Sequence, residues 1–411
     1  MLKKSKLLSA LLVLLVVILA CANNPLGGNA PAQPINVETI VAATFQALTA
    51  AAPEPAVATL PSEASSLLPH SMYFLNNSTG LVQVYRLEKD GKTVTQITFE
   101  PVKVDDYDVS RIDGSVVYVT NNQMFTVNAD GGNRSKLLEG GPADPNDAFV
   151  NHITVPLWSP DGQTIAYGYH GINLYSIAGG QSTRVLDDQL KTDNGFTLGE
   201  VNIPISYSAD GSKMLIRIVP LASDGGMVAV FTLGNKSLVR LTGNSHSICC
   251  SLQWSGDNNT LYGGNATYNP FVSPGLWRVD GTSGIVTNLI PSLSENDSIL
   301  NFASNPFLAP DGQLYFFHTT QPFTQQDEVS RVPLQLVRSA SDGVTKRTVL
   351  RPETFQDMNE ALWAPDASFV IIADAPIQEV YQGGLAELVY TDGQKGVISL
   401  IPFAMEMKWG P

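Results

Sequence analysis

Carboxylates and histidines are the side chains of this chain best suited to chemistry. Converging carboxylates can hold Ca²⁺ or another hard cation, and a histidine can transfer a proton near neutral pH. The candidates that we expect near the centre of the molecule are Asp106, Asp108, His152, Glu200, His246, Glu360 and Glu406. Each lies in or beside a short apolar segment that is predicted to be a strand. The fold would therefore have to bring residues from distant segments together.

Known catalytic and metal-binding motifs give these candidates little support. The sequence has no G-x-S-x-G, H-E-x-x-H or Walker motif, and no acidic segment has the D-x-D-x-D-G spacing of a calcium loop. Solvated loop charge and structural histidines are the ordinary alternatives. We therefore predict no catalytic residue, no metal site and no cofactor, with Ca²⁺ as the one ion that the carboxylates could hold.

A repeated turn identifies the elements that must position these residues. The sequence LWSPDG at 157–162 returns as SYSADG, QWSGDN, FLAPDG and LWAPDA. Its acidic position falls at intervals of 48, 49, 47, 54 and 55 residues, at Asp113, Asp161, Asp210, Asp257, Asp311 and Asp366. Proline presets φ, aspartate accepts backbone N–H bonds and glycine takes positive φ, so a turn explains the triplet without chemistry. A period near fifty that contains short strands is typical of a four-stranded propeller blade.

The copy at 152–188 shows the expected parts of one blade. HITVPLW, QTIAYGY, INLYSIA and TRVLDD are predicted strands separated by turns. The large apolar residue before the repeated turn is expected to pack where neighbouring blades meet, and this position holds Trp158, Tyr207, Trp254, Leu308 and Trp363.

Two turn sequences resemble those of a known repeat family. The segment NADGGNRSKL at 128–137 resembles the turn between the last two strands of TolB-like (WD40-like) propeller repeats, and the family's S/A-P-D-G turn occurs at 159–162 and 309–312. Weaker forms occur at 208–211 and 364–367, so the resemblance covers about 330 residues. It implies an all-β propeller and says little about function, because such blades serve unrelated tasks.

The two ends of the repeat region predict how the ring closes. The final segment FAMEMKWGP matches a first strand and the start of a turn, whereas SMYFLNN, GLVQVYRLE and TVTQITFE look like a second, third and fourth strand. We therefore expect residues 403–409 to pair with residues 71–99 in one blade. The expected domain, 71–411, then has seven blades, one more than TolB itself.

Insertions in the predicted blades gather on one face. The longer loops VPLASDGGM, NATYNPFVSPG, HTTQPFTQQDEVSR and DAPIQEVYQGG all follow a predicted second strand. Long loops in compact domains tend to be functional, and aromatic residues on a polar rim are typical of recognition surfaces. The expected ligand-binding rim consists of Leu221, Tyr268, Phe271, Phe323 and Tyr381. The alternative is that each of these side chains only holds its own loop in place.

The first seventy residues have the composition of an export signal and a tether. Three lysines and a short apolar run in 1–20 precede Cys21, and ILAC resembles a bacterial lipobox, which implies cleavage before Cys21 and lipid attachment to its thiol. An uncleaved anchor or a plain signal peptide is the alternative. Residues 21–70 are rich in Ala and Pro, with one amphipathic helix expected at about 36–52. We thus expect a lipid-anchored, extracytoplasmic protein.

Two adjacent cysteines lie in a predicted first strand. Cys249 and Cys250 would point to opposite sides of that strand, so a pair of buried thiols is expected. Export leaves a vicinal disulfide open as the alternative.

Composition limits the partners. The formal net charge is −14 with 24 Lys and Arg against 38 Asp and Glu, which disfavours a nucleic-acid partner. We expect a monomer that is not an enzyme and that binds a protein, peptide or cell-envelope ligand on its loop-rich face. The alternative is a propeller hydrolase or lyase that acts on extracellular carbohydrate or peptide through the central carboxylates and His152.

Overall fold

The computed structural model describes residues 66–142, 151–193, 196–221, 226–242, 252–269, 272–293, 298–323 and 329–411. Contacts divide the chain into two units, Met1–Glu63 and Ala64–Pro411, and the second unit is described here. The predicted signal, Cys21, the tether helix, His246, Cys249, Cys250 and Phe271 lie outside the described residues. All regular elements of the described residues are β-strands. Among them, no helix has the length and apolar character needed to span a bilayer.

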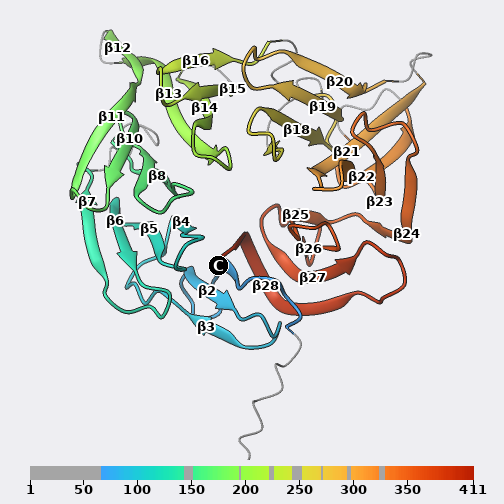
Figure 1. Cartoon of the computed structure of the whole chain (residues 1–411), viewed down its shortest axis with the longest axis horizontal. Helices are drawn as coiled ribbons and strands as arrows, with labels where there is room; N and C mark the ends of the chain where they lie inside the picture. Colours follow the sequence, from blue (N-terminus) through green and yellow to red (C-terminus); the bar gives the residue numbers. More distant parts are fainter. Residues whose placement is uncertain are drawn as a thin grey trace, which may run out of the picture. The chain divides into compact units, whose positions relative to one another are not determined.

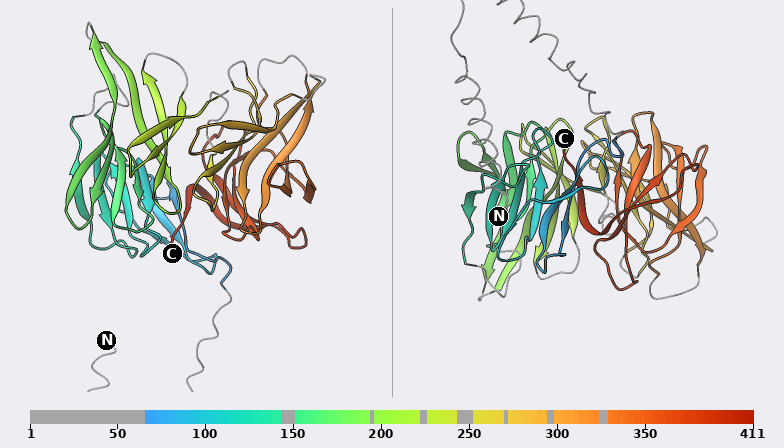
Figure 2. Two further views of the ribbon diagram at one scale, coloured as in Figure 1. Left: turned by 45° about the horizontal axis from the view of Figure 1, so that its top comes forward. Right: turned by 90° about the horizontal axis from the view of Figure 1, so that it is seen from below.

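Antiparallel sheets make up the described unit, and Figure 1 shows them arranged around a central opening. Four sheets have four strands each. Their strands are β4–β7 (Asp106–Val109, Val116–Thr120, Gln123–Val127, Ser135–Glu139), β8–β11 (Thr154–Trp158, Thr164–Gly168, Gly171–Ser176, Gln181–Asp187), β17–β20 (Gln253–Trp254, Thr260–Asn265, Gly275–Asp280, Val286–Ile290) and β21–β24 (Ile299–Leu308, Gln313–Pro322, Leu334–Ala340, Thr348–Phe355). Figure 2 shows the strands running between the two faces of the ring, where the loops gather.

The two remaining sheets are larger. One has five strands, β12–β16 (Gln189–Asp193, Phe196–Tyr207, Lys213–Leu221, Met227–Thr232, Ser237–Arg240). The other has seven strands in the order β25-β26-β27-β28-β1-β2-β3 (Met358–Trp363, Phe369–Asp374, Gly384–Tyr390, Ile398–Trp409, Met72–Asn76, Gln83–Leu87, Val94–Gln96). It therefore joins the last strands of the chain to the first described strands.

The long strand β28 makes that junction by changing partners along its length. Its first part pairs with β27, from Leu388 opposite Ile398 to Gly384 opposite Ala404. Its second part pairs with β1, where Met72 lies opposite Trp409. The expected pairing of residues 403–409 with the beginning of the domain is thus confirmed.

Apolar clusters fill the junctions between consecutive sheets. Many strands carry nearly continuous runs of apolar residues, so each sheet can pack against a neighbour on both of its faces. These clusters join β1–β2 to β4–β6, β5–β6 to β9, β8–β10 to β14–β15, β14–β15 to β18–β19, β18–β20 to β21–β23, β21–β24 to β25–β27, and β26–β28 to β1–β2. The large residues before the repeated turn pack in or against these clusters. Trp363 is buried there, while Trp158, Tyr207, Trp254 and Leu308 are half-buried.

The repeated turns are built by their aspartates, as the sequence predicted. Asp161 Oδ1 accepts the Ser159 hydroxyl at 2.6 Å and the Gln163 amide at 3.0 Å. Asp257 does the same with Ser255, Asn259 and Thr260. These hydrogen bonds to the charged form hold the pKa of Asp161 below its usual value. The turn aspartates are therefore committed to structure.

One element departs from expectation. The β12–β13 hairpin, in which Gln189 lies opposite Glu200, was not predicted from the sequence. Polar and apolar side chains are mixed in QLKTD of β12 and in FTLGE at the start of β13, so these residues suit either a loop or a paired strand. As a result, β13 extends for 12 residues, and its first part pairs with β12 as well as with β14.

Candidate functional site

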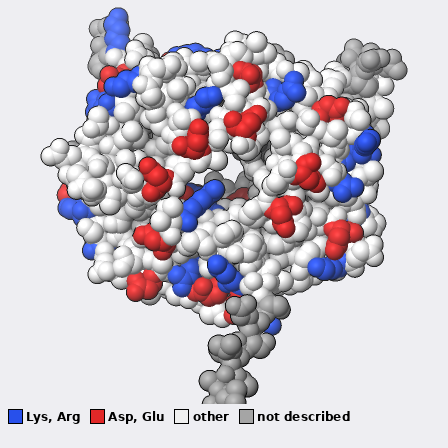
Figure 3. All heavy atoms as spheres, in the orientation of Figure 1, with Lys and Arg blue, Asp and Glu red and all other residues white. Residues whose placement is uncertain are grey.

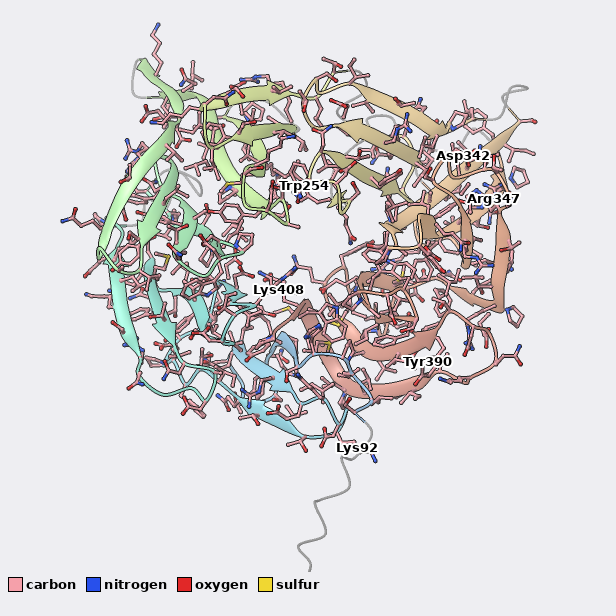
Figure 4. The ribbon with its side chains drawn as sticks, viewed as in Figure 1. Lys92, Trp254, Asp342, Arg347, Tyr390 and Lys408 are labelled. Carbon is pink, nitrogen blue, oxygen red and sulfur yellow. The ribbon has the colours of Figure 1, made fainter. Side chains whose placement is uncertain are left out.

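The central opening brings together four of the carboxylates that the sequence singled out. Asp106 and Asp108 lie on β4, Glu360 on β25 and Glu406 on β28. Lys408, also on β28, lies among them, and we call these five residues the channel cluster. Figure 4 places Lys408 at the edge of the central opening, and Figure 3 shows basic atoms at the margin of that hollow with acidic patches around it.

Lys408 connects β28 to β4. Its Nζ lies 3.4 Å from Asp108 Oδ1 and donates to the carbonyl oxygen of Tyr107. It also lies 4.8 Å from the centre of the Tyr107 ring, within cation–π range. The second oxygen of Asp108 accepts the Trp158 amide at 2.7 Å, which ties β4 to the next sheet. Lys408 and Asp108 together thus connect β28, β4 and β8 at the axis.

Glu360 secures the point at which β28 changes partners. Its two oxygens accept the backbone amides of Glu406 at 2.9 Å and Met407 at 3.1 Å. Glu406 has a positive φ of 53°, so β28 is bent there and these two amides turn away from the ladder. The Tyr107 hydroxyl donates to the Glu406 carbonyl at 2.6 Å. Side chains therefore replace the missing strand partners of β28.

Burial shifts the charges of the channel cluster. It raises the pKa of Asp106 and Glu360, although Lys408 opposes this for Asp106 and the two backbone amides oppose it for Glu360. Burial alone would lower the pKa of Lys408, but the carboxylates of Asp108, Asp106 and Glu406 raise it above its ordinary value. Lys408 is therefore charged at neutral pH.

Glu406 is the carboxylate of the cluster that titrates close to neutral pH. Burial, with the charge of Asp106 as the next cause, raises its pKa to about 7. Its carboxyl group lies among the other charged side chains of the channel cluster, while the residue keeps an exposed surface that water in the opening reaches. Water therefore screens its charge. The raised pKa of Glu406 changes its protonation near neutral pH and costs little stability.

We expect carboxyl-detected NMR to show Glu406 titrating near pH 7, well above the ordinary value of 4.5. Glu139, whose pKa is lowered by Lys136, serves as the internal control and should titrate below that value. A Glu406 midpoint close to 4.5 would contradict the close approach of Asp106 to Glu406.

The other central candidates do not join the channel cluster. Glu200 lies on the β12–β13 hairpin and pairs with Arg240, at 2.5 and 3.0 Å. His152 precedes β8 and is half-buried. Among the described residues, the cluster carboxylates instead contact Lys408 and backbone amides. Within the described residues, no group of three or more His, Cys, Asp or Glu side chains is arranged to hold a metal ion.

The predicted rim residues divide into packed and exposed ones. Tyr268 and Phe323 pack edge to face at 5.8 Å and lie against the cluster between β21–β24 and β25–β27, while Leu221 packs near Val201. Tyr381 is 70% exposed, with the Arg331 guanidinium 4.9 Å from its ring centre. Tyr268, Phe323 and Leu221 thus hold their loops in place, and Tyr381 faces solvent.

The same face carries further exposed apolar residues that the sequence analysis missed. Phe99 is 73% exposed, and together with Tyr381 it defines an apolar rim surface that also includes Leu81, Val102 and Ile377. These loops lie on one face because each follows a strand that runs in the same direction across the ring. An isolated aromatic residue beside Pro101 in a connection between blades was the available signal for Phe99.

Hydrogen bonds and close packing connect the apolar rim surface across two blades. Gln83 binds the loop that holds Phe99 and Val102, through the Glu100 amide at 3.0 Å and the Val102 carbonyl at 3.3 Å. Asn76 donates to the Phe403 carbonyl at 2.6 Å. A Cβ on Gly383 would lie 2.7 Å from the Phe403 ring, so the loop between β26 and β27 packs against the same residue that Asn76 binds.

Comparison with known proteins addresses the fold. No family model and no curated protein matches the chain. Among solved structures, a puromycin-hydrolyzing peptidase of Mycobacterium tuberculosis is similar, with a TM-score of 0.52 and 14% identity over 84% of this chain and 56% of that chain. Oligogalacturonate lyase from Vibrio parahaemolyticus has a TM-score of 0.50 and 11% identity, over 81% and 84% of the two chains. The chain has a β-propeller fold.

The propeller is also similar to TolB from Acinetobacter baumannii, with a TM-score of 0.42 and 17% identity over 80% of this chain and 79% of that chain. The β-propeller fold that the TolB-like resemblance of the repeats implied is confirmed. The chain spans about half the length of the peptidase. Identities this low concern the fold alone, and propellers with quite different activities are among the similar proteins.

Proposed function

We propose that this chain is a lipid-anchored, extracytoplasmic propeller of seven blades that binds a protein, peptide or cell-envelope ligand through its loop-rich face. In this proposal Cys21 carries the lipid, residues 21–70 form the tether, and the propeller acts as a monomeric binding or scaffold module. Calcium is not required for the proposed binding.

The count of seven blades is supported by the two halves of β28. Its first half completes the sheet of β25–β27, and its second half completes the sheet of β1–β3. Divided at this strand, the seven-stranded sheet yields two four-stranded blades beside the other five sheets. The apolar clusters between consecutive sheets agree with this division.

The apolar rim surface is the observation that carries the binding function. Single exposed apolar residues are ordinary, but Phe99 and Tyr381 lie on the same face, on loops that are each held in place by contacts with β1, β2 or β28. Aromatic residues anchored in such a surface commonly supply most of the binding energy in protein interfaces. The Arg331 guanidinium under Tyr381 adds a polar group suited to a peptide carbonyl or carboxylate.

A double variant tests this function. Phe99→Ser with Tyr381→Ser should weaken binding to ligands captured from the native membrane fraction by about tenfold or more, because both aromatic anchors are lost. Ile112→Ser with Val344→Ser removes apolar residues of similar exposure, 64% and 55%, from the turns of the other face, and should leave binding unchanged. Equal capture by both double variants would contradict the proposal.

The channel cluster favours a second candidate function, a hydrolase or lyase acting on carbohydrate or peptide. Carboxylates converge at the axis, and Glu406 has a pKa of about 7, which suits a general acid or base. Lys408, however, is engaged by Asp108 and Tyr107, and Glu360 by backbone amides. These contacts give the cluster a structural task already.

The two functions are distinguished by one comparison. Hydrolysis or elimination of an extracellular carbohydrate or peptide that disappears in Glu406→Gln, and persists in the Phe99→Ser, Tyr381→Ser variant, would favour the enzyme. Loss of ligand binding in the rim variant alone favours the binding module.

A further inference from the structure

A cleft between the sheets β17–β20 and β21–β24 has a volume of about 490 Å³. That volume falls within the range of about 300–1,000 Å³ that is usual for small-molecule sites. The cleft is bordered by the turns that follow β17, β19 and β21, at the opposite end of the strands from the apolar rim surface. Its occupant is therefore distinct from a ligand of that surface.

Strand register places a polar row along one wall of this cleft. Tyr262 on β18 lies opposite Arg278 on β19, and Arg278 lies opposite Thr287 on β20. Cross-strand partners point to the same side of a sheet, here towards β21–β24. Tyr262 belongs to the apolar cluster between the two sheets, and all three residues line the cleft.

The sheet that contains β1–β3 has an equivalent row of Tyr, Arg and Thr, and its arginine is bound to a carboxylate. Tyr73, Arg86 and Thr95 are cross-strand partners there. Arg86 binds a carboxylate, with Nη2 and Nε at 2.5 and 2.8 Å from Glu88 Oε1. The hydroxyls of Thr95 and Ser71 approach the same carboxylate at 3.5 and 3.4 Å. In this sheet, the Tyr–Arg–Thr row thus binds a carboxylate.

The row in the cleft lacks this internal carboxylate. Asp280 occupies the position that corresponds to Glu88, two residues after the arginine. Its Oδ1 instead accepts the amides of Thr282 and Ser283, at 3.0 and 2.7 Å, and the Ser283 hydroxyl at 2.9 Å. The Arg278 side chain makes no hydrogen bond or ion pair within the described part of the chain, and Thr287 lies beside it.

We propose that this cleft binds a small hydroxylated carboxylate, whose carboxylate group takes the place at Arg278 and Thr287 that Glu88 holds beside Arg86 and Thr95. Arg278 supplies a charge-assisted, two-point contact. The hydroxyls of Thr260, Ser283 and Ser341 border the same cleft and are suited to bind the ligand's hydroxyl groups. This inference does not depend on the proposed function.

Binding is tested on the full chain by calorimetry and NMR with gluconate, compared with sorbitol, which has a hydroxymethyl group in place of the carboxylate. Gluconate should bind and shift the amide signals of residues 260–262 and 278–287, whereas sorbitol should not. A peptide arm, trialanine against trialanine amide, distinguishes a free small acid from a peptide C-terminus as the source of the carboxylate. Binding of trialanine with no binding of gluconate would overturn the proposed ligand class.

Substitutions locate the site. Arg278→Met should weaken gluconate binding by about 10-fold to 100-fold, because a hydrogen bond between two charged groups is lost. Thr287→Val should weaken it by several-fold. Arg338→Met is the matched control, because Arg338 lies in the equivalent row of Tyr315 and Thr348 on the next sheet and does not border this cleft. An equal loss in Arg278→Met and Arg338→Met, or no binding of gluconate by the unaltered chain, would overturn the proposal.

Discussion

Deleting residues 403–411 should leave a chain that cannot keep its native fold. The deletion removes the part of β28 that pairs with β1, together with the buried side chains of Ala404 and Met407. It also removes the hydrogen bond from the Trp409 indole to the Trp363 carbonyl, at 2.7 Å. Losing the buried Met407 side chain alone costs about 2–5 kcal/mol, a large share of the total stability of a typical domain, about 5–15 kcal/mol.

The outcome of this deletion is measured by circular dichroism and size-exclusion chromatography. We expect loss of a cooperative thermal transition and association through the exposed edge of β1, because an unpaired strand is a template for pairing with other chains. Deleting only Pro411 is the control and should be neutral, since it removes no strand pair. A stable monomer without residues 403–411 would contradict closure by β28.

Lys408→Met should be the most damaging single substitution at the axis. The Lys408 and Asp108 side chains are 27% and 16% exposed, and both belong to a cluster with four carboxylates and one cation. Removing the cation leaves those carboxylates without compensation, which costs about 3 kcal/mol for a largely buried pair. Methionine keeps the apolar part of the side chain, so the loss reports on charge rather than packing.

The cost of Lys408→Met should depend on pH in a defined direction. The raised folded-state pKa values of Asp106, Glu360 and Glu406 mean that the folded form holds its protons more tightly than the unfolded form. This contribution to stability is complete at low pH and is lost as the pH rises through about 7 for Glu406. Without Lys408 these pKa values rise further, so the cost should be small near about pH 5 and greatest above about pH 7.

Urea unfolding of both proteins across this pH range gives the comparison. Lys103→Met is the matched control, because Lys103 is 68% exposed and its ion pair among the described residues is with the exposed Asp105. It should cost less than about 1 kcal/mol at every pH. A loss for Lys408→Met that is equal at low and high pH would show that the carboxylates of the channel cluster do not depend on its charge.

Much of the fold follows from the sequence because its turns are local. The aspartate of each repeated turn is hydrogen-bonded by residues two or three positions away, as at Asp161 and Asp257. A short segment of sequence is therefore enough to recognise each repeated turn. The β12–β13 hairpin escaped prediction because its residues also suit a polar loop, and pairing decides between the two.

The candidate site was less predictable, since it depends on contacts between distant segments. The acidic residues of β4, β25 and β28 were expected near the axis, and the structure brings Asp106, Asp108, Glu360 and Glu406 together. Lys408 was missed, although it follows Glu406 by two residues and so points the same way along the strand. Tyr381 is exposed, whereas Tyr268 packs against Phe323. No property of the two loop sequences predicts this difference.

Hydrogen exchange of the C-terminal strand tests the central claim most directly, namely that β28 closes the ring by pairing with both β27 and β1. Mass spectrometry of the full chain in increasing urea would compare peptides covering 402–411, 384–390 and 71–87. Closure predicts that the amides of all three peptides become exposed together, with the global unfolding of the propeller. Rapid exchange in 402–411 while 71–87 remains protected would contradict it.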